Sequence, residues 1–319
     1  MYILTGLIIF LLLSTILNNI MVKVEAKRYR QPGKLIEIDG HKMHITGNGT
    51  GQPTVVMTCA SGSTFGYADY YFINSKVSDF TRTCIYERPG IGWSEHASTP
   101  RDTEQIVSDL HTLLHKAGEK PPYILVGHSL GTMEMLLYAH NYPDEVAGMV
   151  LIDGASPYLY IHNPKFATYR CIVYFLRFLR FLRYTGIIRI LSELKLMPYV
   201  NYRIKHLPKD IGKLDKAMLY KNLVNSMATK ELSSIVSTSL NMNEKLDLKD
   251  IPMIIYSVRE SFKKMPSWEE SQKSLLGLSS NSKQIILENT IHSNVLYDSW
   301  EQISEGIKEL IINKIVKHS

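Results

Sequence analysis

The sequence GHSLG, residues 127–131, decides the fold of this 319-residue chain. It lies between an apolar run at residues 123–126 and a run typical of a helix at residues 132–142. A serine in a tight turn between a buried strand and a helix is a nucleophile elbow. The strained serine backbone requires small residues two positions before and after it, and Gly127 and Gly131 meet that requirement. The following helix points its free N–H groups at the turn, so the motif predicts that Ser129 is a nucleophile.

The composition is that of an ordinary globular protein, with 45% hydrophobic and 21% charged residues. The length suits one large α/β domain with an inserted subdomain, or two small domains. The net charge of +6 is modest, and no zinc-finger or Gly/aromatic pattern accompanies it, so we expect no nucleic-acid partner. The three cysteines form no C-x-x-C pair and no metal-ligand spacing, and the sequence predicts no metal site and no cofactor.

The N-terminal segment predicts a membrane anchor. Residues 3–22 carry no charge and are mostly apolar, and a helix of that length spans roughly 30 Å, the hydrocarbon thickness of a bilayer. A cleaved signal peptide would carry Lys or Arg before the apolar run, whereas here the basic residues follow it, at Lys23, Lys27, Arg28 and Arg30. The positive-inside rule therefore favours a single-pass protein of the cell membrane with its main domain in the cytoplasm. The alternative is cleavage near residues 24–26.

The rest of the chain alternates between segments typical of strands and of helices. Residues 35–38 and 41–46 predict two antiparallel strands joined by a turn at Asp39-Gly40. Four short apolar strands follow, at residues 54–59, 83–86, 124–126 and 150–152. With an amphipathic helix at 102–117, this alternation predicts a doubly wound, mostly parallel sheet. Ligands of such sheets bind at the carboxyl ends of the strands.

Between residues 155 and 246 the alternation stops. The segment is rich in Tyr, Phe, Leu and Arg, and Phe-Leu-Arg occurs three times in succession over residues 175–183. We predict a helical cap, inserted before the sheet resumes with strands at 251–256 and 282–287 and a final helix at 300–316. The predicted organisation is an anchor (1–22), a linker (23–33), a sheet domain in two parts (34–154 and 247–319) and the cap (155–246).

These segments resemble the α/β-hydrolase superfamily, and specifically its serine-esterase-like branch. The sequence YERPGIGWS, residues 86–94, looks like the loop after that superfamily's fourth strand, and GHSLG looks like its elbow. The resemblance covers roughly residues 34–154 and 250–319, whereas the cap matches in position only. Cys59-Ala60 departs from the usual His-Gly, and Thr132 stands where a third elbow glycine is common. Neither departure removes a catalytic side chain.

A serine hydroxyl needs a base to become a good nucleophile. In the superfamily the acid and then the histidine follow the serine along the chain, which implies His292, after the last strand, as the base. The acid would hold the imidazole in the correct tautomer. Its commonest position is the loop after the seventh strand, where Glu260 is the only carboxylate but falls one residue short of the usual spacing. We therefore expect Asp153, at the end of the sixth strand, with Glu260 as the alternative.

The resemblance also implies an oxyanion hole formed by the backbone N–H groups of Leu130 and Ser61. With Ser129, His292 and Asp153, this predicts a membrane-anchored serine hydrolase that cleaves carboxylic esters through an acyl-enzyme. The alternatives are an acyltransferase or a small-peptide amide hydrolase that uses the same residues, and a non-catalytic binding protein with this fold. Dehalogenases and epoxide hydrolases are disfavoured, because those relatives place Asp where this chain has Ser129.

Arginines interrupt the apolar part of the cap, at Arg170, Arg177, Arg180, Arg183 and Arg189. A period of three drifts around a helix, so they spread over a broad face. One interpretation is a solvated face of the cap. The other is a basic amphipathic surface that contacts anionic lipid headgroups, with the arginines snorkelling. Together with residues 3–22, the second interpretation favours a small-molecule ester of lipid-like character as the substrate.

Overall fold

The computed structural model describes residues 2–163 and 169–318 and contains one eight-stranded sheet in the order β1-β2-β4-β3-β5-β6-β7-β8. The strands are β1 (Lys34–Ile38), β2 (His41–Asn48), β3 (Thr54–Thr58), β4 (Thr83–Glu87), β5 (Tyr123–His128), β6 (Val146–Ile152), β7 (Met253–Val258) and β8 (Ser282–Leu287). β1 and β2 form an antiparallel hairpin, and β2 also runs antiparallel to β4. The other pairs are parallel. The predicted doubly wound, mostly parallel sheet is confirmed.

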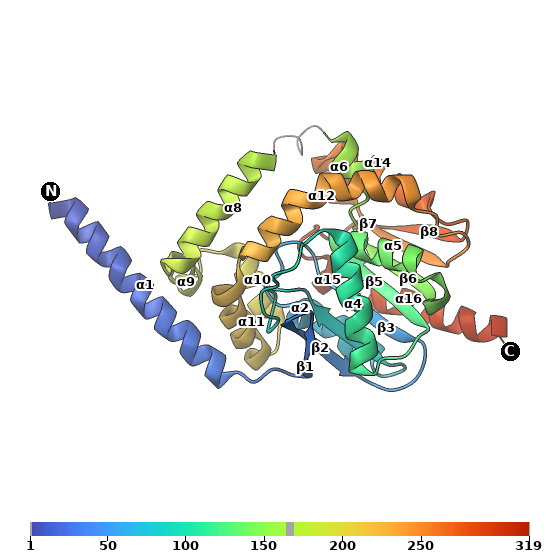
Figure 1. Ribbon diagram of the computed structural model, residues 1–319, viewed down its shortest axis with the longest axis horizontal. Helices are drawn as coiled ribbons and strands as arrows, with labels where there is room; N and C mark the ends of the chain where they lie inside the picture. The colour runs from blue at the N-terminus through green and yellow to red at the C-terminus, as the bar shows by residue number, and fades with distance from the viewer. Residues whose placement is uncertain (1, 164–168, 319) are drawn as a thin grey trace.

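Helices cover both faces of the sheet (Figure 1). They are α2 (Gly66–Asp69), α3 (Tyr71–Val77), α4 (Thr103–Ala117), α5 (Gly131–Asn141), α13 (Arg259–Lys264), α14 (Pro266–Leu276), α15 (Val295–Asp298) and α16 (Trp300–His318), with a 3₁₀ turn, η1 (Pro143–Glu145), before β6. α4 and α5 lie on one face, and α3 packs with α16 on the other. Asp102 caps α4 by accepting a 2.9 Å hydrogen bond from the Gln105 N–H.

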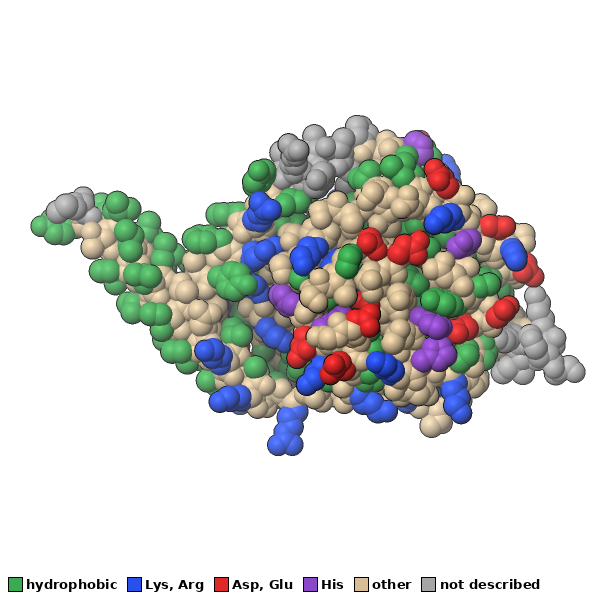
Figure 2. All heavy atoms as spheres, viewed as in Figure 1, with side chains coloured by type: hydrophobic (Ala, Val, Ile, Leu, Met, Phe, Trp, Pro, Cys, Tyr) green, Lys and Arg blue, Asp and Glu red, His purple; other side chains and the backbone are tan. Residues whose placement is uncertain are grey.

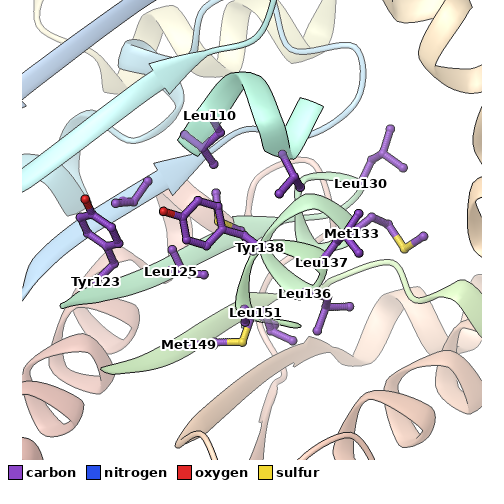
Figure 3. Close-up of a cluster of buried hydrophobic side chains, with 14 of the residues drawn as sticks. Leu110, Tyr123, Leu125, Leu130, Met133, Leu136, Leu137, Tyr138, Met149 and Leu151 are labelled. Carbon is purple, nitrogen blue, oxygen red and sulfur yellow. The ribbon is translucent and has the colours of Figure 1, made fainter. Parts of the chain in front are cut away.

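The core lies in two apolar layers, one on each face of the sheet. Tyr123 and Leu125 of β5 enter the layer beneath α4 and α5, which Figure 3 shows, whereas Ile124 and Val126 enter the opposite layer. A strand that is buried on both faces must be apolar at every position. This explains why the apolar run before the elbow is continuous rather than alternating. Because β5 lies near the middle of the strand order, the elbow lies near the middle of the row of strand carboxyl ends.

The described residues between β6 and β7 form helices joined by short connections. The helices are α6 (Pro157–His162), α8 (Tyr169–Tyr184), α9 (Ile187–Glu193), α10 (Pro198–His206), α11 (Lys209–Asn222) and α12 (Ser226–Lys245). Asparagine amides hold this cap on the loop after β4. The Asn225 Nδ2 donates to the Gly90 carbonyl at 2.7 Å, and the Asn222 Nδ2 donates to the Gly92 carbonyl at 2.9 Å. Both asparagines are buried, so these bonds fix the cap over the carboxyl ends of the strands.

The helix α1 (Tyr2–Arg28) is the one described helix long and apolar enough to cross a membrane. Its N-terminal part projects from the body of the molecule with apolar side chains on its surface (Figures 1 and 2). The helix continues through residues 23–28, which the sequence predicts as part of the linker. That stretch holds no Gly or Pro, and the chain leaves the helix only just before Pro32 and Gly33.

One side of α1 packs against the cap. The Ser14 hydroxyl donates to the Thr185 carbonyl at 2.6 Å, and Asn18 is 5% exposed. The Arg189 guanidinium binds both Glu25 carboxylate oxygens, at 2.7 and 2.8 Å, and the Asn18 Oδ1 at 3.0 Å. Gly186 permits this approach: its φ is +79°, and a Cβ there would lie 2.7 Å from the Ser14 Oγ. α1 is therefore docked on the cap by polar contacts.

The arginines of the cap differ in what they contact. Arg180 binds the carbonyls of Val224 and Asn225, Arg183 is 5% exposed, and Arg189 binds α1. The Arg170 side chain lies outside the described residues. Among Arg177, Arg180, Arg183 and Arg189, Arg177 is the one whose side chain projects into solvent. The exposed face of α8 is mainly aromatic instead, and consists of Tyr174, Phe175, Phe178, Phe181 and Tyr184.

Candidate active site

Ser129 lies in a strained turn between β5 and α5. Its φ is +54°, a left-handed conformation that a residue with a side chain adopts only at a cost. A Cβ at Gly127 would lie 2.9 Å from the Thr132 Cα, and one at Gly131 would lie 2.8 Å from the Cys59 carbonyl oxygen. The two glycines therefore allow the close backbone approaches that this turn requires. The turn leaves the Ser129 side chain partly exposed at the sheet edge.

The departure at Thr132 is accommodated by a glycine elsewhere in the chain. Thr132 is fully buried, and its hydroxyl lies where a Cβ at Gly154 would meet it at 2.4 Å. Gly154 lies two residues after the end of β6, so the larger side chain at the start of α5 is accommodated by a residue without a side chain beside the neighbouring strand end. The elbow consequently keeps its geometry without a third glycine of its own.

A hydrogen-bonded series joins Ser129, His292 and Asp153. The His292 Nε2 lies 3.0 Å from the Ser129 Oγ, and the His292 Nδ1 lies 2.6 Å from the Asp153 Oδ2. An ionised carboxylate only accepts hydrogen bonds, so Asp153 fixes the proton on Nδ1 and leaves Nε2 free to accept the serine proton. The Asp153 side chain is fully buried, whereas that of His292 is 38% exposed. The hydrogen bonds thus connect the buried Asp153 through His292 to the accessible Ser129 hydroxyl.

Several donors converge on Asp153. The Ser261 hydroxyl donates to the Oδ2 at 2.6 Å, and the Trp268 Nε1 and the Val258 N–H donate to the Oδ1 at 2.9 and 3.0 Å. Burial by itself would raise the pKa of Asp153. The hydrogen bonds from His292, Ser261 and Val258 outweigh burial and hold the pKa below its ordinary value. Asp153 therefore remains charged beside the imidazole.

Glu260, the alternative acid, does not reach His292. Its carboxylate lies at the surface on α13 and pairs with Lys263 and Lys264 of the same helix at 3.7 and 3.6 Å. The same helix contributes the neighbouring Ser261 instead, as a donor to Asp153. Neither Ser261 nor Trp268 can be predicted as a partner of Asp153 from the sequence, because a serine and a tryptophan on short surface helices carry no motif of their own.

His128, which belongs to the elbow, contacts the loop that carries His292, here called the histidine loop. Its Nε2 lies 3.2 Å from the His292 carbonyl oxygen, and the two rings are 5.0 Å apart. Burial, followed by the adjacent His292 ring, lowers the pKa of His128 to about 3. A neutral His128 therefore donates to the His292 carbonyl across the physiological pH range, and its side chain is directed at the histidine loop.

The loop after β3 approaches the elbow, as the contact between Gly131 and Cys59 indicates. Arg88, from the loop after β4, lies beneath it with 2% of its surface exposed. Its Nη1 donates to the Cys59 carbonyl at 2.9 Å, and its Nη2 donates to the Ala60 carbonyl at 3.1 Å. The Ala60 carbonyl and the Ser61 N–H belong to one planar trans peptide, so holding the carbonyl toward Arg88 turns the N–H away from it. Arg88 thereby sets the direction of the Ser61 N–H.

Arg88 is itself fixed by acidic groups from two helices. It forms an ion pair with Glu134 of α5 and lies 3.4 Å from Glu231 of α12. Glu134 also accepts hydrogen bonds from Thr58 at 2.7 Å and from Tyr86. The cluster links the end of β3, the elbow helix and the cap. Arg88 lies within the motif at residues 86–94, but nothing in that motif predicts this role.

A mostly apolar pocket of about 370 Å³ lies between the loop after β3 and the cap. Gly62, Ser63 and Thr64 form its side on the sheet domain. The cap contributes Leu196, Met197, Pro198, Tyr199, Val200, Arg203, Asp215, Leu219 and Leu223. The pocket therefore begins one residue after Ser61.

Comparisons with known proteins agree with this architecture. A family model described as the alpha/beta hydrolase fold matches residues 64–182. The uncharacterized protein YbdG of Bacillus subtilis is 30% identical over 146 residues, which make up 46% of this chain and 45% of YbdG. The match thus spans less than half the length of that relative.

Solved structures extend the likeness over nearly the whole chain. The Cif epoxide hydrolase of Acinetobacter nosocomialis superimposes with a TM-score of 0.69 at 15% identity, over 93% of this chain and 96% of that one. A thermophilic esterase of Thermogutta terrifontis gives a TM-score of 0.64 at 16% identity, over 90% and 99%. At these identities the likeness is one of fold.

Proposed function

We propose that this chain, which has the α/β-hydrolase fold, is a serine hydrolase that cleaves carboxylic esters. The observation that carries the proposal is the continuous series from the Ser129 Oγ through His292 to the buried Asp153, with spacings of 3.0 and 2.6 Å. Epoxide hydrolases of the superfamily carry an aspartate nucleophile, and a serine at the elbow favours acyl transfer instead.

The reaction proceeds in two halves. The Ser129 Oγ attacks the ester carbonyl carbon while the His292 Nε2 takes the hydroxyl proton. The N–H groups of Leu130 and Ser61 stabilise the oxyanion, and no hydrogen bond among the described residues occupies either group. The intermediate expels the alcohol, which takes the proton from His292, and leaves an acyl group on Ser129. Water, activated by the same imidazole, then releases the carboxylic acid.

The pocket beside Ser61 supports the proposal that the substrate carries an apolar acyl or alcohol chain. Leu196, Met197, Val200, Leu219 and Leu223 supply most of its apolar lining. Burying apolar surface contributes about 25 cal/mol per Å², so such a pocket favours an aliphatic or aromatic chain over a charged one. We therefore assign a small-molecule ester of lipid-like character as the substrate class. No metal and no cofactor is needed for this chemistry.

Membrane attachment through α1 is part of the same proposal, with the sheet domain on the cytoplasmic side. Ser14 and Asn18, which contact the cap, lie within the apolar part of α1, so insertion of α1 into a bilayer would bring the neighbouring helix α8 close to lipid. The aromatic residues on the exposed face of α8 suit a position at the membrane interface.

Active-site labelling tests the enzymatic proposal. A fluorophosphonate probe should label the full chain and should fail to label Ser129→Ala or heat-denatured protein. Hydrolysis of p-nitrophenyl esters should follow the same pattern, with medium acyl chains preferred over acetate. A folded protein that takes up no probe would instead be a non-catalytic binding protein, and the proposed function would be wrong.

Membrane fractionation tests the anchor. The full-length chain should remain in the membrane pellet after a carbonate wash, because insertion of apolar residues does not depend on salt. A chain that begins at Lys34 should move largely into the supernatant while it retains esterase activity. Recovery of the full-length chain in the soluble fraction would contradict the proposal.

A further inference from the structure

We propose that His111, His115 and Glu145 form a binding site for a divalent transition-metal ion of the Zn²⁺ class. The site lies far from the proposed reaction centre along the strands. Glu145 directly precedes β6 and so lies at the amino ends of the parallel strands, whereas Ser129 and Asp153 lie at their carboxyl ends. The two histidines are four residues apart on α4, a spacing that places both rings on one face of a helix.

The three ligand atoms form a nearly equilateral triangle. The His111 Nε2 lies 3.2 Å from the Glu145 Oε1 and 3.1 Å from the His115 Nε2, and the His115 Nε2 lies 3.5 Å from the same Oε1. Zn²⁺ binds imidazole nitrogen and carboxylate oxygen at about 2.0–2.2 Å in tetrahedral geometry, which separates neighbouring ligands by about 3.3–3.5 Å. One ion can therefore contact all three atoms, with water in the fourth position.

The arrangement satisfies hydrogen bonding poorly without a cation. Two neutral Nε2 atoms that face each other at 3.1 Å can share only one proton, and the Glu145 Oε1 competes for it. A metal ion accepts a lone pair from each of the three atoms at once. Imidazole with carboxylate suits Zn²⁺, Cu²⁺ and Ni²⁺, whereas Mg²⁺ and Ca²⁺ prefer oxygen ligands alone.

Two tyrosines hold the ligands in place. The Tyr138 hydroxyl donates to the Glu145 Oε2 at 2.6 Å, so the carboxylate turns its Oε1 toward the two rings. Tyr142 stacks on His111 with the ring centroids 3.9 Å apart and the planes inclined by 5°. Such supporting contacts orient metal ligands and typically contribute 10- to 100-fold in affinity. His115 is the exposed member of the site, with 53% of its side-chain surface accessible, and provides the entry path.

The bound ion would tie the second half of α4 to the turn before β6. Because metal binds the folded chain and not the separated segments, saturation should raise the unfolding temperature. The reaction centre shares no residue with this site, so the ester-hydrolysis rate should remain unchanged. This separates the proposal from the proposed function, since metal binding and catalysis can fail independently.

The test is calorimetric titration of untagged full-length protein with ZnCl₂, together with thermal melting. We expect one Zn²⁺ per chain and a rise of a few degrees in unfolding temperature. Both should be lost in His115→Ala and in Glu145→Gln, and Tyr138→Phe should weaken binding by about tenfold. His140→Ala, a half-buried histidine outside the cluster, should bind normally. Co²⁺ should give the intense visible absorption of a tetrahedral complex, and Mg²⁺ should give no response.

Three results would overturn the proposal. One is the absence of binding at millimolar Zn²⁺, and another is unchanged binding by the His115→Ala, Glu145→Gln double variant. The third is loss of binding in His140→Ala while His115→Ala still binds, which would place the ion elsewhere. Because His115 is exposed, its substitution leaves the fold intact, and circular dichroism of each variant verifies this.

Discussion

The edge of the sheet at Ser129 and the junction between α1 and the cap are both networks of polar groups, but different features position them. At the sheet edge, Ser129 and Asp153 extend from strained turns at strand ends, with φ of +54° and +40°. The backbone of the sheet therefore places them. At the junction, Arg189 reaches from one helix to Asn18 and Glu25 of another. Substitutions at the sheet edge should lower the rate and spare the fold, whereas substitutions at the junction should loosen packing and spare the rate.

The largest expected effect comes from Ser129→Ala. Removal of the Oγ leaves the strained turn in place, because alanine is smaller and the turn is set by the glycines around it. We expect kcat for a p-nitrophenyl ester to fall by about 10⁶, as removal of a serine nucleophile does in proteases. The melting temperature should change little. Turnover within tenfold of the wild type would show that Ser129 is not the nucleophile.

Asp153→Asn should have the next largest effect. The amide cannot fix the His292 tautomer, and loss of the corresponding aspartate in a well-studied triad costs roughly 10⁴ in kcat. Glu260→Gln is the matched control and should cost less than about tenfold, because Glu260 pairs with surface lysines. The measurement is kcat for both variants at pH 7.5. A larger loss in Glu260→Gln than in Asp153→Asn would reverse the assignment of the acid.

Arg88→Lys tests whether the Arg88 guanidinium positions the loop after β3. Lysine keeps the positive charge beside Glu134 but lacks the planar fork that binds the Cys59 and Ala60 carbonyls together. One oxyanion donor is worth about 10²–10³ in rate, so a misdirected Ser61 N–H should lower kcat by about 10- to 100-fold with KM nearly unchanged. An equal rise in KM, or an unaltered kcat, would count against a positioning role.

The smallest effect on rate should come from Arg189→Gln. It breaks the bidentate pair with Glu25, a hydrogen-bonded charge pair worth about 1.5–3 kcal/mol. Trypsin should then cleave the detergent-solubilised protein after Arg28 or Arg30 about tenfold faster, because α1 leaves the cap more often. Esterase activity should stay within twofold. Arg177→Gln is the control, since that side chain projects into solvent, and it should leave both measurements unchanged.

The candidate site could be predicted from sequence where a backbone turn dictates side-chain position. Ser129 needs small residues around it, and the carboxyl ends of parallel strands lie together, which places Ser129 beside Asp153. His292 was assigned from the order of serine, acid and histidine along the chain that the superfamily resemblance implies. The choice between Asp153 and Glu260 needed the structure, because spacing along a loop does not determine where a short helix such as α13 points its side chains.

Three networks depend on tertiary contacts that the sequence does not encode locally. Arg88 lies within the motif at residues 86–94, but its hydrogen bonds to the Cys59 and Ala60 carbonyls depend on how the ends of β3 and β4 pack. His111 and His115 have a spacing that could have been noticed, yet the third ligand, Glu145, is thirty residues further along the chain. Ser261 and Trp268 lie on helices that follow β7, and both donate hydrogen bonds to Asp153, which follows β6.

The sequence by itself determined the alternating elements, the elbow and the apolar N-terminal helix, because hydrophobic periodicity and glycine placement act locally. Only the tertiary structure decided that Asp153 faces His292 and that the arginines at 180, 183 and 189 turn inward. It also decided that α1 docks on the cap. The physical reason is the same in each case: a polar side chain goes where its partner is, and the partner comes from a distant part of the chain.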